Sequence, residues 1–157
     1  MRNRIFFLLA LSVFLQNAGV ASHKAKFSAY IQCEKGGGFA DVGVLDSQKD
    51  LTRALSREGF RIALSPQDAD IELTVTSRLT GYQVASINRG ISGGSYPNTP
   101  IVANWHYVFV HLRAGELEKS WCGYGRLWKD CASRLADEIK KFATANEAEL
   151  LSKRKAK

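Results

Sequence analysis

The stretch Asp70-Ile71-Glu72-Leu73-Thr74-Val75-Thr76-Ser77-Arg78-Leu79-Thr80 alternates apolar and polar residues more cleanly than any other part of the chain. Successive side chains of a strand point to opposite faces, so this pattern predicts a strand with one face in the core and the other in water. Strands of this half-solvated kind are typical of antiparallel sheets. The predicted core face carries Ile71, Leu73, Val75, Ser77 and Leu79.

The residues before this strand predict a strand, a helix and a second, short strand. Residues 26–34 alternate in the same way, and the glycines at 36–38 end that strand. The polar residues at 46–50 resemble a capping box at the start of a helix. Gly59 ends this helix, because glycine readily adopts the left-handed conformation that closes helices. Residues 60–64 follow as the short strand.

The residues after it predict a long loop, a hairpin and a final helix. Gly81 marks a bulge, beyond which the strand continues to about residue 87. Residues 88–100 are rich in glycine and proline and form a loop that is long for a connection inside a compact domain. The hairpin strands and the helix lie at residues 104–113, 117–124 and 129–150.

The amino-terminal residues have the three-part layout of a secretory signal peptide. A basic start at residues 1–4 precedes an apolar run of about 11 residues, and small residues at 18–22 offer a cleavage site near Ala21. Spanning a bilayer takes roughly 20 apolar residues, so no stable transmembrane anchor is expected after cleavage. The sequence therefore predicts a periplasmic or secreted protein.

The order β-α-β-β-β-β-α after the signal peptide indicates an α+β fold. We expect a two-layer sandwich in which helices lie on one face of a mostly antiparallel sheet. Residues 1–21 are the signal peptide, and residues 22–150 are long enough for one domain with its own core. The basic residues 151–157 are expected to be a disordered tail.

The charge balance gives little reason to expect a nucleic-acid partner. The chain has 22 Lys and Arg residues against 15 Asp and Glu residues, and part of the excess lies in the basic tail. A short charged terminus is usually solvated, and the strands lack the interleaved aromatic and basic residues of single-strand binders. No nucleic acid and no cofactor are predicted.

Aromatic residues share one face of the predicted hairpin. Val108, Val110 and Leu112 mark the core face, which leaves the aromatic residues on the opposite side. Exposed aromatic patches can mark binding sites, although such residues also stabilise sheets as cross-strand partners covered by a loop. The candidate binding residues in the long loop and on this face are Arg89, Tyr96, Trp105, Tyr107 and Tyr124.

Three cysteines in an exported chain allow one disulfide. Cys33 and Cys131 are both predicted to face the core, whereas Cys122 lies on the aromatic face. The pattern favours a Cys33–Cys131 bond without excluding the other two pairings.

Catalytic and metal-binding signals are weak. Residues 90–94 fit the pattern G-x-S-x-G around Ser92, but Pro97 follows where the helix of a hydrolase should begin. His106 and His111 are five residues apart on a strand and point to opposite faces, so they cannot hold one metal ion together. No catalytic residue and no metal site are predicted.

Three short runs resemble a family of small bacterial envelope proteins. They are Ala54-Leu55, Gly59-Phe60 and the run from Asp68-Ala69-Asp70 to Val75. The "AL…GF…DAD…L.V" pattern is similar to that of the amino-terminal domain of TolB and of the curli-secretion lipoprotein group. The resemblance covers roughly residues 46–80 and implies envelope assembly or binding rather than catalysis. The lipidation cysteine of the lipoprotein members is absent, because Cys33 lies too far from the leader.

Three hypotheses for function follow. The leading one is a non-enzymatic periplasmic or secreted domain that binds an envelope protein partner. The second is a small secreted hydrolase that uses Ser92 or Cys122. The third is a structural exported protein with no dedicated ligand.

Overall fold

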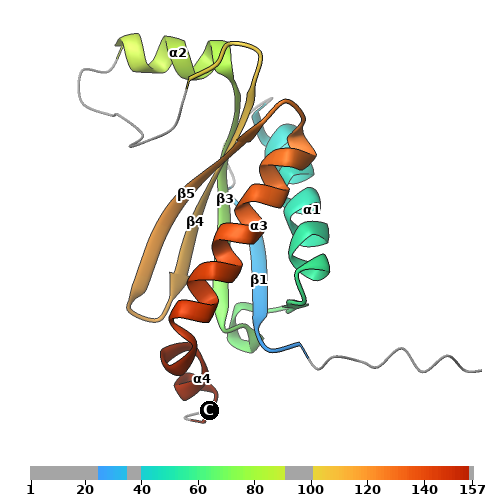
Figure 1. Ribbon diagram of the computed structural model, residues 1–157, viewed down its shortest axis with the longest axis vertical. Helices are drawn as coiled ribbons and strands as arrows, with labels where there is room; N and C mark the ends of the chain where they lie inside the picture. Colours follow the sequence, from blue (N-terminus) through green and yellow to red (C-terminus); the bar gives the residue numbers. More distant parts are fainter. Residues whose placement is uncertain (1–24, 35–39, 91–100, 156–157) are drawn as a thin grey trace, which may run out of the picture.

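The computed structural model describes residues 25–34, 40–90 and 101–155, which build a five-stranded sheet in the order β2-β1-β3-β4-β5 (Figure 1). β1 pairs in parallel with β2 and β3, whereas β3, β4 and β5 are antiparallel. The predicted α+β class is confirmed, and the sheet is mixed because a helix separates β1 from β2. The strands are β1 (Ser28–Cys33), β2 (Arg61–Ile62), β3 (Ile71–Thr80), β4 (His106–Ala114) and β5 (Leu117–Gly125).

Two long helices form the second layer. α1 (Ala40–Arg57) and α3 (Trp128–Ala145) lie side by side over one face of the sheet (Figure 1). The shorter helices α2 (Gly81–Gly90) and α4 (Glu147–Lys155) lie at opposite ends of the molecule (Figure 1). A 3-10 turn, η1 (Pro66–Asp68), precedes β3. In the parts of the chain that the structure describes, every helix is too short or too polar to cross a membrane.

The main core fills the space between the sheet and the two long helices. Val108, Val110 and Leu112 of β4 face this core, as the sequence predicts. Leu135 and Ile139 of α3 pack against these side chains from the helical layer. Each of these side chains is almost wholly buried, which contributes about 1.5–3 kcal/mol per side chain of its size.

The alternation of β3 is interrupted at Thr76, which corrects the predicted core face. Val75 pairs with Val110, but the next residue in register with β4 is Ser77, so Thr76 is the extra residue of a bulge. A one-residue insertion exchanges the faces of all later side chains. Leu79 therefore packs in a second cluster on the other face of the sheet, while Arg78 turns towards the helices.

The strand predicted beyond Gly81 is helix α2. The backbone N–H and the hydroxyl of Thr80 both donate to Oε1 of Gln83, at 2.7 and 3.1 Å. The bond from the Thr80 N–H to the Gln83 side chain is one half of a capping box, and the T-x-x-Q spacing that allows it is present in the sequence. A side chain at Gly81 would clash with the carbonyl of Val102, so this turn out of the sheet requires glycine. The prediction of a bulged strand is wrong, because the chain leaves the sheet at Gly81 and forms a helix.

The carboxyl-terminal helix predicted at 129–150 is divided at Asn146. The side-chain amide of Asn146 donates to the carbonyl of Phe142 at 2.8 Å and so caps the end of α3. α4 then continues to Lys155, and its Leu150 is buried in the core. Residues 151–155, for which the sequence predicts a disordered tail, are helical in the structure.

Gly123 is where α3 packs most closely on β5, and this contact gives a stability prediction. A Cβ atom there would clash with the carbonyl of Cys131 and lie 2.6 Å from Cγ of Leu135. We expect Gly123→Ala to lower the free energy of unfolding by about 1–3 kcal/mol, because the helix must move away. Urea unfolding measures the change, and Glu118→Ala, at an exposed position of the same strand, serves as the control. An unchanged midpoint for Gly123→Ala would contradict the close packing.

Candidate binding groove along strand β5

A groove of about 600 Å³ runs beside β5, the last strand of the sheet. Neighbouring side chains of a strand point to opposite faces, so a hollow lined by consecutive residues must follow the edge of the strand. The opposite wall belongs to α3. The lining residues are Lys119, Ser120, Trp121, Cys122, Tyr124, Arg134, Leu135, Asp137, Glu138 and Lys141.

Tyr124, which stacks on Trp105, and Arg134 line one end of the groove. The rings of Trp105 and Tyr124 are nearly parallel, with centroids 5.4 Å apart. Arg134 of α3 places its guanidinium carbon 4.8 Å from the centre of the Tyr124 ring. Cation–π contacts of this kind contribute about 0.5–1 kcal/mol at exposed sites. Arg134 therefore reaches past the edge of β5 towards the face of the sheet that α1 and α3 do not cover.

A second aromatic pair supports the other end. The rings of Trp121 and Phe142 meet edge to face at 5.4 Å. Nζ of Lys119 lies 5.2 Å from the centre of the Trp121 ring. On the α3 wall of the groove, Lys141 forms an ion pair of 2.7 Å with Glu138. The groove thus combines aromatic surface with charges of both signs.

The structure separates the residues for which the sequence predicts binding. Trp105 and Tyr124 are half-buried, and Tyr124 lines the groove. Tyr107 is fully buried, and its hydroxyl accepts a hydrogen bond of 2.7 Å from the backbone N–H of Val102. Tyr107 is therefore part of the second core cluster, in which α2 contributes Val84, and offers no surface to a partner. The side chain of Arg89 and all of Tyr96 lie outside the described residues.

Sequence reasoning missed the α3 side of the groove. Arg134, Asp137, Glu138 and Lys141 form the polar side of a helix whose apolar side was recognised. A polar helix face alone predicts contact with solvent, so nothing in the spacing indicates that this face lies opposite an edge strand.

The cysteines lie on the predicted faces but do not form the predicted disulfide. Cys131 belongs to the main core and Cys33 packs against it, whereas Cys122 packs against the second cluster. The structure has Cys33 and Cys131 as thiols, so the Cys33–Cys131 bond is absent from it. Burial raises the pKa of the Cys131 thiol to about 12, so that thiol stays protonated at neutral pH.

The two histidines occupy different environments. His106 stacks on Trp128 with centroids 4.0 Å apart, on the helix side of the sheet. Nδ1 of His111 lies 3.1 Å from the hydroxyl of Ser120. Within residues 25–34, 40–90 and 101–155, no three His, Cys, Asp or Glu side chains are grouped so that they could hold a metal ion. Ser92 lies outside the described residues.

Arg78, whose side chain is only 15% exposed, contacts the start of α3. The guanidinium carbon of Arg78 lies 3.8 Å from the centre of the Trp128 ring. Its Nη1 donates to the carbonyl of Gly43 at 2.8 Å and lies 3.6 Å from a carboxylate oxygen of Asp46. Arg78 therefore joins β3 to both long helices. The sequence alternation hides this role, because it assigns Arg78 to the solvent face.

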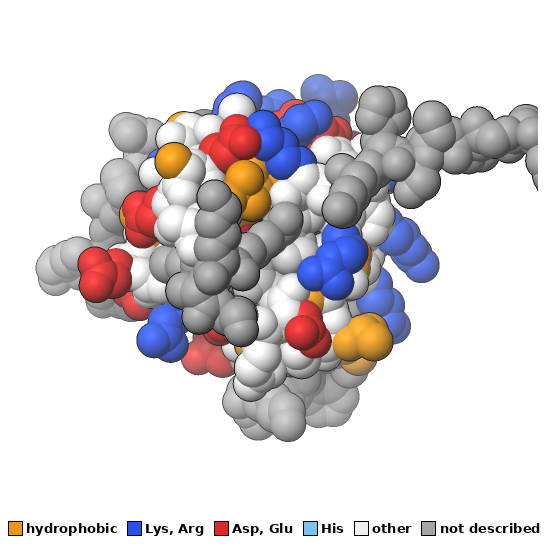
Figure 2. Space-filling view, turned by 90° about the horizontal axis from the view of Figure 1, so that it is seen from below, with side chains coloured by type: hydrophobic (Ala, Val, Ile, Leu, Met, Phe, Trp, Pro, Cys, Tyr) orange, Lys and Arg blue, Asp and Glu red, His pale blue; other side chains and the backbone are white. Residues whose placement is uncertain are grey.

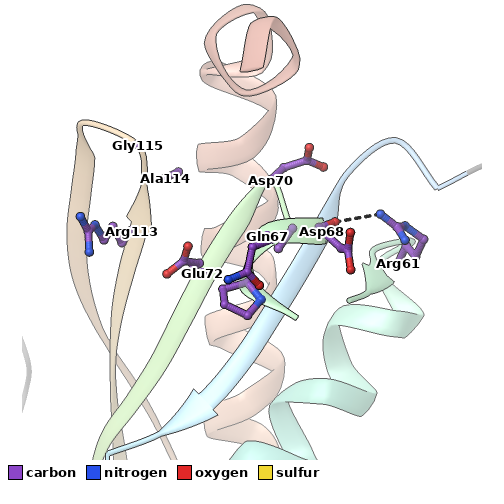
Figure 3. Close-up of a pocket in the computed structure, with 10 residues that line it drawn as sticks. Arg61, Gln67, Asp68, Asp70, Glu72, Arg113, Ala114 and Gly115 are labelled. Carbon is purple, nitrogen blue, oxygen red and sulfur yellow. Dashed lines mark hydrogen bonds between the residues drawn. The ribbon is translucent and has the colours of Figure 1, made fainter. Parts of the chain in front are cut away.

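A second hollow, of about 470 Å³, lies at the end of the sheet away from α2 (Figure 3). Polar groups that line this hollow form hydrogen bonds within the protein. Oδ2 of Asp70 accepts hydrogen bonds from the backbone N–H and the hydroxyl of Ser28, at 2.6 and 2.7 Å. Arg61 donates to the carbonyl of Asp68 at 2.9 Å, as the dashed line in Figure 3 marks. Figure 2 shows acidic and basic side chains interspersed over this end, without a dominant charge.

Comparisons with known proteins leave the family open. No family model matches the sequence, and no curated protein matches it significantly. Among solved structures, the chain is similar to the crystal structure of a DUF4136 family protein from Bacteroides thetaiotaomicron. The identity is 14%, the TM-score is 0.32, and the match covers 81% of this chain and 91% of that chain. A likeness at this level assigns no function.

The surroundings of His106 predict that the folded protein loses stability in acid. Nδ1 of His106 is buried with no hydrogen-bond partner among the described residues. Burial, and secondarily the Arg78 guanidinium, lower the pKa of His106 below its ordinary value of 6.5. The folded state therefore favours neutral His106, so its contribution is complete above about pH 6.5 and is lost as the pH falls towards the lowered pKa.

We expect the free energy of unfolding to fall more for the wild type than for His106→Gln between about pH 7.5 and about pH 5. Urea unfolding at the two pH values measures both falls. His111→Gln should keep the wild-type dependence, because His111 lies on the other face. Equal falls in the wild type and His106→Gln would show that the imidazole does not couple protonation to folding.

Proposed function

We propose that this chain is an exported, non-enzymatic domain of the bacterial envelope that binds an extended segment of an envelope protein along β5. The observation that carries the proposal is the groove along the edge of that strand. An edge strand presents backbone N–H and C=O groups that an added strand can pair with. The groove gives such a segment a second wall on α3.

The side chains around the groove suit recognition. Trp121 lies on the helix side of β5, whereas Cys122 and Tyr124 lie on the other side, so the two faces of an added strand would meet different surfaces. Arg134 and Lys119 offer positive charge at the two ends, and Asp137 lies on the helical wall. Main-chain pairing then supplies affinity, while these side chains select the sequence of the segment.

Export to the envelope is supported by the leader pattern at residues 1–21 and by the resemblance of residues 46–80 to envelope proteins. Both come from the sequence.

Export has a direct test. We expect the mature protein to begin at Ser22 and to be found outside the cytoplasm, because the leader is removed during secretion. Intact mass and amino-terminal sequencing of fractionated cells measure this. Leu11→Arg, which places a charge in the apolar run, should leave an uncut precursor inside the cell, whereas Lys24→Ala should be processed normally. A wild-type protein that keeps Met1 in the cytoplasm would contradict export.

Binding at the groove can be tested by photo-crosslinking in cells. A photo-reactive amino acid at Ser120 or Glu138 should capture one discrete protein, whereas the same group at Arg53, exposed on α1, should not. Arg134→Glu should reduce the capture from Ser120 several-fold, because it reverses the charge at the Tyr124 end. Arg53→Glu makes the same charge change away from the groove and should leave the capture unchanged.

Strand addition has a second readout in the complex. Hydrogen exchange of the β5 amides should slow when the captured protein binds, because edge N–H groups then gain partners. Capture that is equal from Arg53 and Ser120, or β5 exchange that does not change, would exclude the groove as the binding site. A complete absence of captured protein in all variants would favour a structural role.

A further inference from the structure

Strand register brings three chain segments together at the α2 end of the sheet. Thr80, His106 and Gly125 lie in one row across β3, β4 and β5. Beyond this row the chain enters α2 from β3, residues 101–105 lead into β4, and residues 126–128 follow β5. Neighbouring strands are about 4.8 Å apart, so the three segments lie within roughly 10 Å of one another.

Four large apolar side chains are exposed on these segments. Their exposed fractions are 66% for Tyr82, 43% for Ile101, 37% for Val102 and 50% for Leu127. The backbone of Gly81 lies against the carbonyl of Val102, so Tyr82 begins α2 directly beside that segment. Large apolar groups that gather at one end of a molecule mark a contact surface, whereas isolated ones do not.

Basic side chains lie beside these apolar side chains. The chain contains no Asp or Glu between residues 73 and 115, which include α2 and the segment 101–105. Arg126 and Lys129 are exposed on either side of Leu127. The carboxylate of Asp130, which follows, accepts a hydrogen bond of 3.1 Å from the backbone N–H of Leu127 and so serves the start of α3.

We propose that this α2-end surface, consisting of Tyr82, Ile101, Val102, Arg126, Leu127 and Lys129, docks on an anionic lipid surface. Apolar side chains beside basic residues bind a bilayer interface by burying the apolar groups among the lipids while the cations face anionic headgroups. A tyrosine suits this boundary, since its ring is apolar and its hydroxyl remains at headgroup level. Figure 1 shows α2 at one end of the molecule.

This docking is independent of the β5 groove. The groove lies along the side of β5 and α3 and shares no residue with the α2-end surface. Each surface can therefore be altered without changing the other.

Vesicle co-sedimentation tests the proposal with protein purified from expressing cells. We expect binding to vesicles of equal parts phosphatidylglycerol and phosphatidylcholine, and little binding to phosphatidylcholine alone. The double variant Tyr82→Ser with Ile101→Ser should weaken binding about tenfold or more, because both side chains lose their burial among the lipids. Arg126→Glu with Lys129→Glu should weaken it and reduce its sensitivity to salt.

Leu64→Ser is the matched control. Leu64 is 97% exposed but lies beside β2, at the opposite end of the sheet, so its loss should leave binding unchanged. Any contribution of the amino-terminal segment is common to all the variants. Thermal unfolding checks that each variant is folded, and a variant that is not is replaced by the charge-reversed pair.

Two results would overturn the proposal. One is the absence of binding to the anionic vesicles. The other is binding that the α2-end variants and Leu64→Ser weaken equally. A protein captured at Tyr82 by photo-crosslinking, together with an absence of vesicle binding, would assign the surface to a protein partner instead.

Discussion

The bulge at Thr76 is the constraint on which the rest of the structure depends. Before it, β3 directs Ile71, Leu73 and Val75 into the core under the long helices. After it, the faces exchange, so Arg78 lies beneath Trp128 and Leu79 joins the cluster on the other side. One extra residue thus adds Leu79 to the apolar cluster on the second face and forms a cationic link between β3, α1 and α3. Without the extra residue, Arg78 would point away from the helices, and Leu79 would occupy the space that Arg78 fills.

The position of α3 follows from this arrangement and creates the groove. Trp128 stacks on Arg78 and His106 at the start of the helix, and Gly123 allows the next turn to approach β5 without a side chain between them. The helix therefore covers the face of β5 but leaves its outer edge open. Open edges are usually protected by charges or by a covering segment. Here Lys119 and Arg134 lie beside the edge, which discourages indiscriminate pairing while leaving room for a selected segment.

The sequence predicts the elements of this fold better than their faces. The α+β class, the central strand, the hairpin and the two long helices follow from periodicity, because each pattern reports burial of one side of one element. Periodicity does not reveal a bulge, so it assigns Arg78 and Leu79 to the wrong faces of β3. Thr80 and Gln83 mark the start of α2 in the sequence, but the residues beyond them also fit the alternation of a strand. The groove depends on which helix face lies opposite an edge strand, and that is a property of packing rather than of any local pattern.

Tyr107 is buried in the second cluster, which lies between the α2-end surface and the β5 groove. The second cluster, formed by Val84, Tyr107 and Phe109 with the residues packed around them, packs α2 against the sheet. Trp105 and Tyr124 continue this cluster towards the groove. The strands run from the α2 end along the length of the molecule (Figure 1). A chain that docks by the α2 end would therefore hold β5 and its groove roughly perpendicular to the lipid surface. In that orientation, a segment pairing with β5 would approach from the side, and the two contacts would not compete for space.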